Sequence, residues 1–195
     1  MDIQSALENW IESDIRLLDL GCGDGTILLN LKNKKGIKGL GVEIKPENIQ
    51  KCLEKGVNVI EHNIDKGLAS ITSDSFDVVL MSQTIQALNN PNLALSEITR
   101  IGKRCIVTIP NFGNWKSRLT LLFKGKMPIT NPLKETWYST QNIHLCTLKD
   151  FESLCSDLEI VIDEKKVLNS KGRTGWYLYL LPNLLGSSVM YKIRK

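Results

Sequence analysis

Short apolar runs alternate with longer amphipathic stretches over the first 110 residues, and this alternation restricts the possible folds more than any other feature of the sequence. Each run has the length of a buried strand, at residues 15–20, 37–42, 57–60, 76–81 and 104–109. The stretches between them predict helices at residues 26–31, 46–53 and 91–100. Strands that are apolar on both faces and alternate with helices indicate a mostly parallel sheet with helices on both faces. We therefore expect an α/β fold with one doubly wound sheet of about seven strands.

The last third of the sequence predicts a helix followed by two antiparallel strands. Thr147 stands three residues before Asp150 and ahead of an amphipathic stretch, which is the pattern of a capping box, so a helix is expected to begin there. Residues 159–168 and 176–181 are rich in apolar and aromatic side chains and are separated by the turn-forming residues 169–172. We expect these two runs to form a C-terminal antiparallel pair.

Length and composition indicate an ordinary globular protein. The chain has 195 residues, close to the ~150 of a typical domain, so we expect a single domain over residues 1–195. A chain of this size buries a core without disulfides or a structural metal. The net charge of +4 is too small to indicate nucleic acid as a partner. The longest apolar runs fall far short of the ~20 residues that span a bilayer, so no membrane association is expected.

The cysteines and the N-terminus bear on the cellular compartment. The chain has five cysteines, an odd number, and none forms a C-x-x-C pair, so we expect reduced thiols and no metal site. Residues 1–5 do not combine a basic region with an apolar stretch, so no signal peptide is expected. Together these features predict a cytoplasmic protein.

One segment, residues 111–146, does not fit the alternation of strands and helices. It contains several aromatic residues, and residues 100–149 carry nine basic side chains but one acidic side chain. Insertions after the fifth strand of an open sheet lie over the carboxyl edge of that sheet, where ligands bind. We expect this 111–146 segment to be an aromatic and basic insertion that serves as a lid or as a surface for a partner, although a merely solvated face has the same composition.

The sharpest motif is a strand that runs into a glycine-rich turn and then a helix, at residues 17–26. Gly21, Gly23 and Gly25 stand at alternate positions, which lets the backbone turn tightly and approach a ligand closely. Glu43 follows at the end of the second predicted strand, where a carboxylate is placed to accept hydrogen bonds from both hydroxyls of a ribose. The motif therefore predicts a nucleoside-containing ligand.

Two classes of ligand use this layout. A dinucleotide site favours a small sixth residue in G-x-G-x-x-G/A, and Thr26 at that position disfavours a nicotinamide cofactor. The G-x-G-x-G spacing instead resembles motif I of the class I S-adenosylmethionine-dependent methyltransferases. This resemblance implies S-adenosylmethionine or S-adenosylhomocysteine as the cofactor. The cofactor-binding residues that it implies are Asp19, Gly21, Cys22, Gly23, Glu43, Ile44, Asn63, Ile64 and Ser82.

The chain departs from the family pattern after the third predicted strand. Such methyltransferases usually carry an acid there that accepts a hydrogen bond from the adenine amino group, and this chain has Asn63. An amide carbonyl accepts the same bond without the charge, and Asp65 is the rival candidate. Asp19 has a second interpretation, in which its carboxylate accepts hydrogen bonds from neighbouring loop amides instead of contacting the cofactor.

The sequence identifies no catalytic base. Four side chains are candidates for contact with a substrate or a partner: Gln83, Gln86, Trp115 and His144. The alternative for the glutamines is simple exposure on a helix, and a lone histidine more often completes a hydrogen-bond network than acts as a base.

Six runs of sequence resemble a single family more specifically: residues 19–25, 56–60, 81–86, 109–115, 125–130 and 137–146. Together they are similar to the MetW methionine-biosynthesis proteins, and the last three carry the specificity because many methyltransferases share the glycine loop. The resemblance implies a methyltransferase fold and a role as partner or activator of a homoserine O-acyltransferase. The alternative is a free-standing S-adenosylmethionine-dependent methyltransferase that acts on a small molecule.

Overall fold

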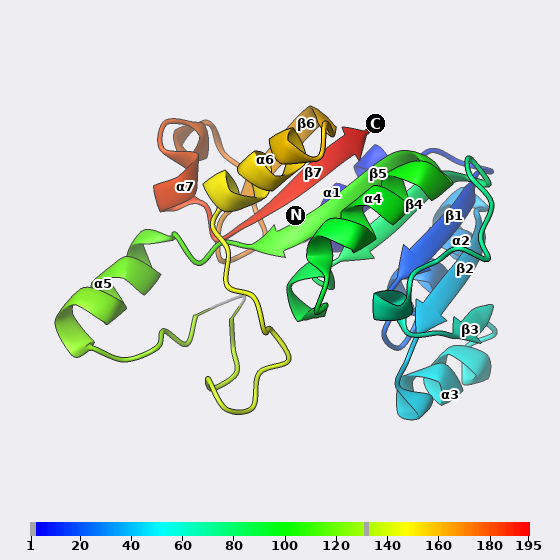
Figure 1. Cartoon of the computed structure of the whole chain (residues 1–195), viewed down its shortest axis with the longest axis horizontal. Coiled ribbons are helices and arrows are strands. Elements are labelled where there is room, and N and C mark those ends of the chain that lie inside the picture. The colour runs from blue at the N-terminus through cyan, green and yellow to red at the C-terminus, as the bar shows by residue number, and fades with distance from the viewer. Residues whose placement is uncertain (1–2, 131–132) are drawn as a thin grey trace.

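The computed structural model describes residues 3–130 and 133–195. Two pairs of residues lie outside the described residues. The first is 1–2, on which the expectation of no signal peptide partly rests, and the second is 131–132 of the 111–146 segment. A seven-stranded sheet with the order β3-β2-β1-β4-β5-β7-β6 crosses the molecule (Figure 1). Its strands are β1 (Arg16–Leu20), β2 (Lys38–Glu43), β3 (Val59–Glu61), β4 (Phe76–Ser82), β5 (Gly102–Pro110), β6 (Val161–Leu168) and β7 (Ser188–Arg194). The first five strands pair in parallel, whereas β7 is antiparallel to β5 and β6.

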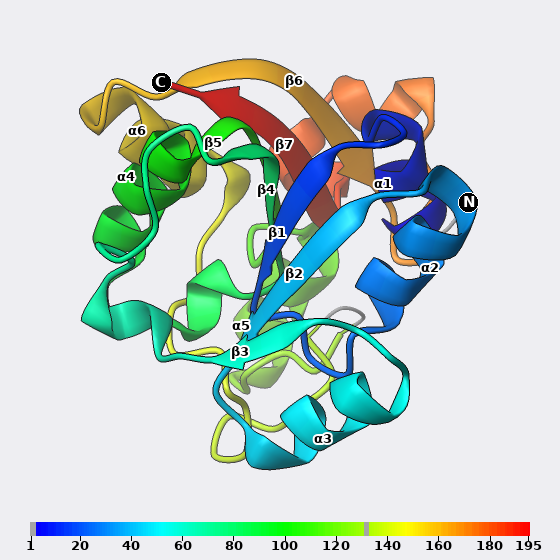
Figure 2. The ribbon, with the colours of Figure 1, turned by 90° about the vertical axis from the view of Figure 1, so that its right-hand side faces the viewer.

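Helices cover both faces of this sheet (Figure 2). The α-helices are α1 (Ile3–Trp10), α2 (Thr26–Lys35), α3 (Pro46–Glu54), α4 (Pro91–Ile101), α5 (Trp115–Lys124), α6 (Leu148–Asp157) and α7 (Pro182–Leu185), and the short 3₁₀ helices are η1 (Ile64–Lys66), η2 (Ile85–Ala87) and η3 (Trp176–Tyr179). Side chains along a strand alternate between its faces, so Leu18 and Leu20 pack in one core with α4 and α6, whereas Leu17 packs in the other with α1 and α2. None of the described helices is long and apolar enough to cross a bilayer.

The predicted α/β fold, with its mostly parallel and doubly wound sheet, is confirmed. The five strands and three helices predicted in the first 110 residues all form, with bounds that differ by a few residues. The capping box also forms, because the Thr147 side chain accepts from the Asp150 N–H and the Asp150 carboxylate accepts from the Thr147 N–H. Local patterns of polarity and capping were therefore sufficient to locate these elements.

One part of the C-terminal prediction is wrong. The antiparallel pair exists, but β6 pairs with β7 and not with residues 176–181. The aromatic residues of that run favour a strand by propensity alone, yet they form η3, in which Trp176 is 78% exposed and Leu178 is buried. β7 lies between β5 and β6, and its Val189 and Tyr191 are completely buried. Burial between two neighbours outweighs propensity here.

The 111–146 segment leaves the carboxyl end of β5 and contains α5, a helix that the alternation of runs did not predict. The Asn114 side chain caps the start of α5 by accepting a hydrogen bond from the Lys116 N–H, and Gly125 ends the helix in the left-handed conformation with φ of 57°. An asparagine before a helix and a glycine after it are the expected signals for its two ends. These two residues were the available sequence signals for α5.

Two buried asparagines hold the start of this segment against the chain that precedes β7. Asn111 Nδ2 donates to the carbonyl oxygens of Asn183 and Gly186, at 3.0 and 2.8 Å. Asn114 Nδ2 donates to the carbonyl oxygens of Leu185 and Gly186, at 3.2 and 2.9 Å. These bonds determine where α5 leaves the sheet.

We predict that Asn111→Ala lowers the free energy of unfolding by about 1–3 kcal/mol, because it removes the side-chain partner of the Asn183 carbonyl oxygen and of the buried Gly113 N–H. The matched control is Asn58→Ala, at an exposed asparagine, for which we expect a change within about 0.5 kcal/mol. Urea unfolding of both variants and of the native protein gives these values. Equal stabilities for the two variants would contradict the role given to the Asn111 amide.

Candidate functional site

The strand order reverses at β1, which lies between β2 and β4, and ligands of open α/β sheets bind at the carboxyl ends of strands beside such a reversal. A cleft of about 600 Å³ lies at this place. Eight of the residues predicted to contact a cofactor or a substrate line the cleft: Gly21, Gly23, Glu43, Ile44, Asn63, Ile64, Ser82 and Gln83. Five others do not line it: Asp19, Cys22, Gln86, Trp115 and His144.

The glycine loop between β1 and α2 forms one wall of the cleft. Gly21 has φ of 74°, and a Cβ atom there would lie 2.5 Å from the Thr84 side chain, so the position accepts no larger residue. Gly23 has φ of 56°, but no protein atom lies within 4 Å of the place that its Cβ would occupy. Because Gly23 lines the cleft, this open space is available to a ligand that lies against the backbone.

Glu43 joins the end of β2 to the glycine loop. Its Oε2 accepts a hydrogen bond from the Gly23 N–H at 2.9 Å, and its Oε1 accepts from the N–H groups of Ile44 and Lys45, at 2.8 and 3.0 Å. The residue is buried but still lines the cleft. A carboxylate has about four acceptor positions, so about one remains for a ligand hydroxyl. Accepting both hydroxyls of a ribose therefore requires one of the backbone hydrogen bonds to open.

Asp19 lies beneath the loop at the end of β1. It is 1% exposed, and neither carboxyl oxygen has a hydrogen-bond partner among the described residues. The interpretation that Asp19 accepts from loop amides is therefore wrong. Burial, and secondarily the charge of Glu43, raise the pKa of Asp19 to about 7. The carboxyl is thus partly protonated near neutral pH.

Two contacts fasten the glycine loop to α3 and the residue that follows it. Lys55 Nζ donates to the Asp24 carboxylate at 2.6 Å and to Thr26 Oγ1 at 2.8 Å, and this ammonium group lowers the pKa of Asp24 to about 2. The Sγ atoms of Cys22 and Cys52 lie 4.0 Å apart, and both residues are buried. Burial raises the pKa of both thiols, so neither has the character of a reactive thiolate.

The loop after β3 forms a second wall. Asn63 Oδ1 accepts from the Asp65 N–H at 3.0 Å and keeps a second lone pair for another donor. Asp65 accepts three hydrogen bonds, from the N–H groups of Asn89 and Asn90 and from Asn89 Nδ2. The carboxylate of Asp65 therefore braces the chain before α4, whereas the Asn63 carbonyl retains capacity toward the cleft.

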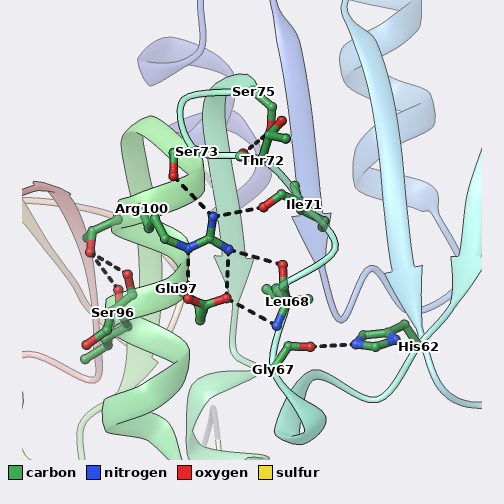
Figure 3. Close-up of polar contacts among 12 residues, drawn as sticks. His62, Gly67, Leu68, Ile71, Thr72, Ser73, Ser75, Ser96, Glu97 and Arg100 are labelled. Atoms are coloured by element: carbon green, nitrogen blue, oxygen red, sulfur yellow. Dashed lines mark hydrogen bonds and ion pairs between the residues drawn. The ribbon is translucent and has the colours of Figure 1, made fainter.

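The chain between η1 and β4 is tied to α4 (Figure 3). The Arg100 guanidinium donates to the Leu68 carbonyl at 3.2 Å and pairs with the Glu97 carboxylate at 2.9 Å, and Glu97 also accepts from the Leu68 N–H. Beside this cluster, His62 Nε2 lies 2.7 Å from the Gly67 carbonyl oxygen. His62 lines the cleft, but one of its ring nitrogens is already engaged by the backbone.

The end of β4 connects the cleft with the 111–146 segment. Ser82 Oγ lies 3.2 Å from Thr108 Oγ1, and the Gln83 N–H donates to the same hydroxyl at 2.9 Å. Gln86 is buried, and its Nε2 donates to the Gln83 carbonyl at 2.8 Å. The backbone carbonyl of Gln86 accepts from the backbone N–H of His144 at 3.0 Å. Gln86 and His144 therefore act as a structural link and not as direct lining of the cleft.

Sequence reasoning missed several residues of the cleft: Lys45, Asn48, His62, Thr84 and Gln141 among them. Gln141 is the most informative, because it belongs to the 111–146 segment and reaches a cleft built by strands far earlier in the chain. Its one sequence signal was the expectation that this segment lies over the carboxyl edge. Trp115 is instead 42% exposed at the start of α5.

In the part of the chain that the structure describes, no cluster of three or more His, Cys, Asp or Glu residues could hold a metal ion.

A family model described as methionine biosynthesis protein MetW matches residues 2–193. The chain belongs to the MetW family. Over 174 residues it is 31% identical to the bifunctional methionine biosynthesis protein MetXA/MetW of Rhodopirellula baltica, an alignment that covers 85% of this chain and 28% of that protein. The chain thus spans less than a third of the length of this relative.

Solved structures agree with the fold of this MetW-family chain. A SAM-dependent methyltransferase from Methanosarcina mazei is 19% identical, with a TM-score of 0.72 over 100% of this chain and 99% of the other. A SAM-dependent methyltransferase from Thermotoga maritima is 20% identical, with a TM-score of 0.69 over 98% of this chain and 87% of the other. At these identities the similarity establishes a class I methyltransferase fold.

We predict that Asp19→Asn makes stability less dependent on pH. The native carboxyl keeps its proton up to about pH 7, whereas the unfolded one loses it near 3.8, so the unfolded state binds fewer protons between these values. Asp19 therefore lowers the free energy of unfolding by up to about 1.4 kcal/mol per unit as pH rises through this window. Urea unfolding between pH 5 and pH 8 should show a shallower decline in the variant. Identical slopes for the two proteins would contradict the raised pKa.

Proposed function

We propose that this protein binds S-adenosylmethionine or S-adenosylhomocysteine in the cleft and acts as the partner or activator of a homoserine O-acyltransferase in methionine formation. The observation that carries the proposal is the Rhodopirellula relative, whose name joins MetXA and MetW in one polypeptide. Two activities joined in one chain are held together at high effective concentration, which is useful when the units work in contact. We further propose that the protein is cytoplasmic, a single domain, and without a nucleic-acid partner.

The cleft residues fit such a nucleoside. The open space at Gly23 accepts a ligand close to the backbone, and Gly21 and Ser82 extend the same wall. Glu43 retains about one acceptor position for a ribose hydroxyl, and Asn63 retains one for the adenine amino group. When bound, the sulfonium cofactor supplies an activated methyl group, and the same contacts hold its demethylated product.

The connection between the cleft and the 111–146 segment supports a regulatory role. Gln141 lines the cleft, and His144 is linked through Gln86 to Gln83, which also lines it. A ligand in the cleft would therefore lie beside Gln141 of the 111–146 segment and beside Gln83, which is hydrogen-bonded through Gln86 to that segment. Binding of the nucleoside product of a methionine pathway at this place is suited to feedback on the acyltransferase.

The second candidate is a free-standing methyltransferase that acts on a small molecule, and the fold of the solved structures supports it. An oxygen or nitrogen acceptor usually needs a general base. Among the described cleft residues, the carboxylates of Asp65 and Glu43 are already engaged, with two asparagines and with the glycine loop. His62 binds the Gly67 carbonyl through one ring nitrogen, so its other ring nitrogen is the one to test as a base for methyl transfer.

We predict that Gly23→Ala weakens binding of S-adenosylhomocysteine at least tenfold, because the methyl group fills space that the ligand needs. Gly56→Ala is the matched control, since it also has a positive φ of 67° and an unobstructed Cβ position but lies outside the cleft. Both variants should lose a similar ~1–2 kcal/mol of stability from the left-handed backbone. Isothermal titration calorimetry separates them: equal affinities for the two variants would argue against a nucleoside at Gly23.

The proposed role predicts a complex with the homoserine O-acyltransferase of the same organism and a faster rate of homoserine acylation when this protein is added. Glu43→Ala should lose most affinity for S-adenosylmethionine in calorimetry, because a ribose without its carboxylate loses its strongest polar contact. The same variant should still form the complex but should no longer respond to the nucleoside.

The outcomes of these assays separate the two functions. No complex together with an unchanged acylation rate would refute the partner role. Labelled methyl transfer from S-adenosylmethionine to a cellular metabolite, abolished in the Glu43→Ala variant, would establish the free-standing methyltransferase instead.

A further inference from the structure

Helix α5 lacks the packing that a helix of its length normally needs. It has 10 residues, and its one buried side chain is Ser117. Helices shorter than ~12–15 residues are marginal in water unless an amphipathic face is buried by tertiary contacts. The helix projects from the end of β5 away from the layers of the sheet (Figure 1).

The apolar stripe of α5 faces solvent. Trp115, Leu119, Leu122 and Phe123 follow the spacing of one helix face, and Leu122 and Phe123 are 73% and 77% exposed. In a surface helix such a stripe ordinarily faces the core of its own chain. Exposed apolar patches of this kind mark interaction sites, and an amphipathic helix commonly binds in an apolar groove of a partner.

A hollow lies at the carboxyl end of α5, where Gly125 is part of its lining. Its volume is about 1110 Å³, and its lining includes Phe112, Met127, Ile129, Trp137 and Tyr138. The two aromatic side chains Trp137 and Tyr138 are 74% and 75% exposed and touch edge to face. Large aromatic side chains of this type are the usual anchors of protein interfaces.

Basic side chains lie beside this surface. Lys116 Nζ lies 5.6 Å from the centre of the Trp115 ring, and Lys126 lines the hollow. Lys124 and Lys134 are further basic residues of the 111–146 segment, in which Glu135 is the one acidic side chain. Across the described residues, none of these lysines forms an ion pair with a carboxylate. Cations at the edge of an apolar patch favour a partner with acidic groups around its own apolar patch, because complementary potentials speed association.

The surface is held in place by the rest of the fold. Asn111 and Asn114 clamp the start of α5 to the chain before β7, and the Arg118 Nε donates to the Gly113 carbonyl at 2.7 Å. An interface element that is ordered before it binds avoids part of the entropy cost of association. α5 is therefore positioned for docking and is separate from the cleft, which it does not line.

We propose that the apolar stripe of α5 and the adjoining hollow form the docking surface for the homoserine O-acyltransferase, which receives α5 in an apolar groove with an acidic edge. This inference rests on the proposed function. The relative that joins MetXA and MetW in one chain supports this occupant over a second copy or an anionic membrane, and the basic side chains beside the surface favour acidic groups opposite it.

The test compares two double variants of the full chain. Leu122→Glu with Phe123→Glu places charge on the stripe, whereas Leu53→Glu with Leu93→Glu alters exposed leucines of α3 and α4, which are 63% and 58% exposed. Calorimetry with the acyltransferase should show at least tenfold weaker binding for the first variant and a change of less than twofold for the control. Both variants should keep native thermal stability and native affinity for S-adenosylhomocysteine.

A charge variant tests the edge of the same surface. Lys116→Glu with Lys126→Glu should slow association with the acyltransferase several-fold at low salt, and the difference should shrink as salt screens the charges. An unchanged association rate at low salt would contradict the acidic edge assigned to the partner.

The results distinguish this inference from the function on which it rests. Native affinity in the Leu122 and Phe123 variant would overturn the docking surface and leave the partner role intact. If the native protein does not bind the acyltransferase, both the docking surface and the partner role are refuted. Sedimentation of the protein alone and with anionic vesicles completes the test. If the native protein forms a dimer, or binds vesicles, and the Leu122 and Phe123 variant does not, while acyltransferase binding is unchanged, the surface belongs to a second copy or to a membrane.

Discussion

The hydrogen bond from the Gly23 N–H to the Glu43 carboxylate joins the two adjacent strands that define the cleft. β1 and β2 are parallel neighbours, so their carboxyl ends meet at one edge and bring the glycine loop against the end of β2. The same arrangement buries Asp19 near Glu43 with no hydrogen-bond partner of its own. A buried carboxyl without a partner lowers stability, and perturbed carboxyls of this kind concentrate at functional sites.

The 111–146 segment has two roles in the arrangement proposed here. On its inner side Gln141 lines the cleft and His144 is linked to its wall, and on its outer side α5 presents apolar side chains to solvent. One segment that contacts both a nucleoside and a partner provides a physical connection between the two. Any coupling between the two proposed sites would be reciprocal, so that each ligand would change the affinity for the other by the same factor.

Most of the fold followed from local patterns, whereas part of the site did not. The alternation of apolar runs and the capping signals located the strands and helices of the first 110 residues, and the glycine spacing with Glu43 located one wall of the cleft. Asp19 and Cys22 belong to the same motif but lie beneath the loop and do not line the cleft. Position within a motif did not reveal which side of the backbone each side chain occupies.

The sequence by itself determined the α/β class, the glycine loop and the family, because each depends on residues close together in the chain or on their periodicity. Tertiary structure alone decided that β7, and not the aromatic run at residues 176–181, completes the sheet, and that Gln141 reaches the cleft. It also decided that the stripe of α5 has no covering layer within the described residues. These outcomes depend on burial and contacts between segments distant in sequence, and local propensity carries no information about such contacts.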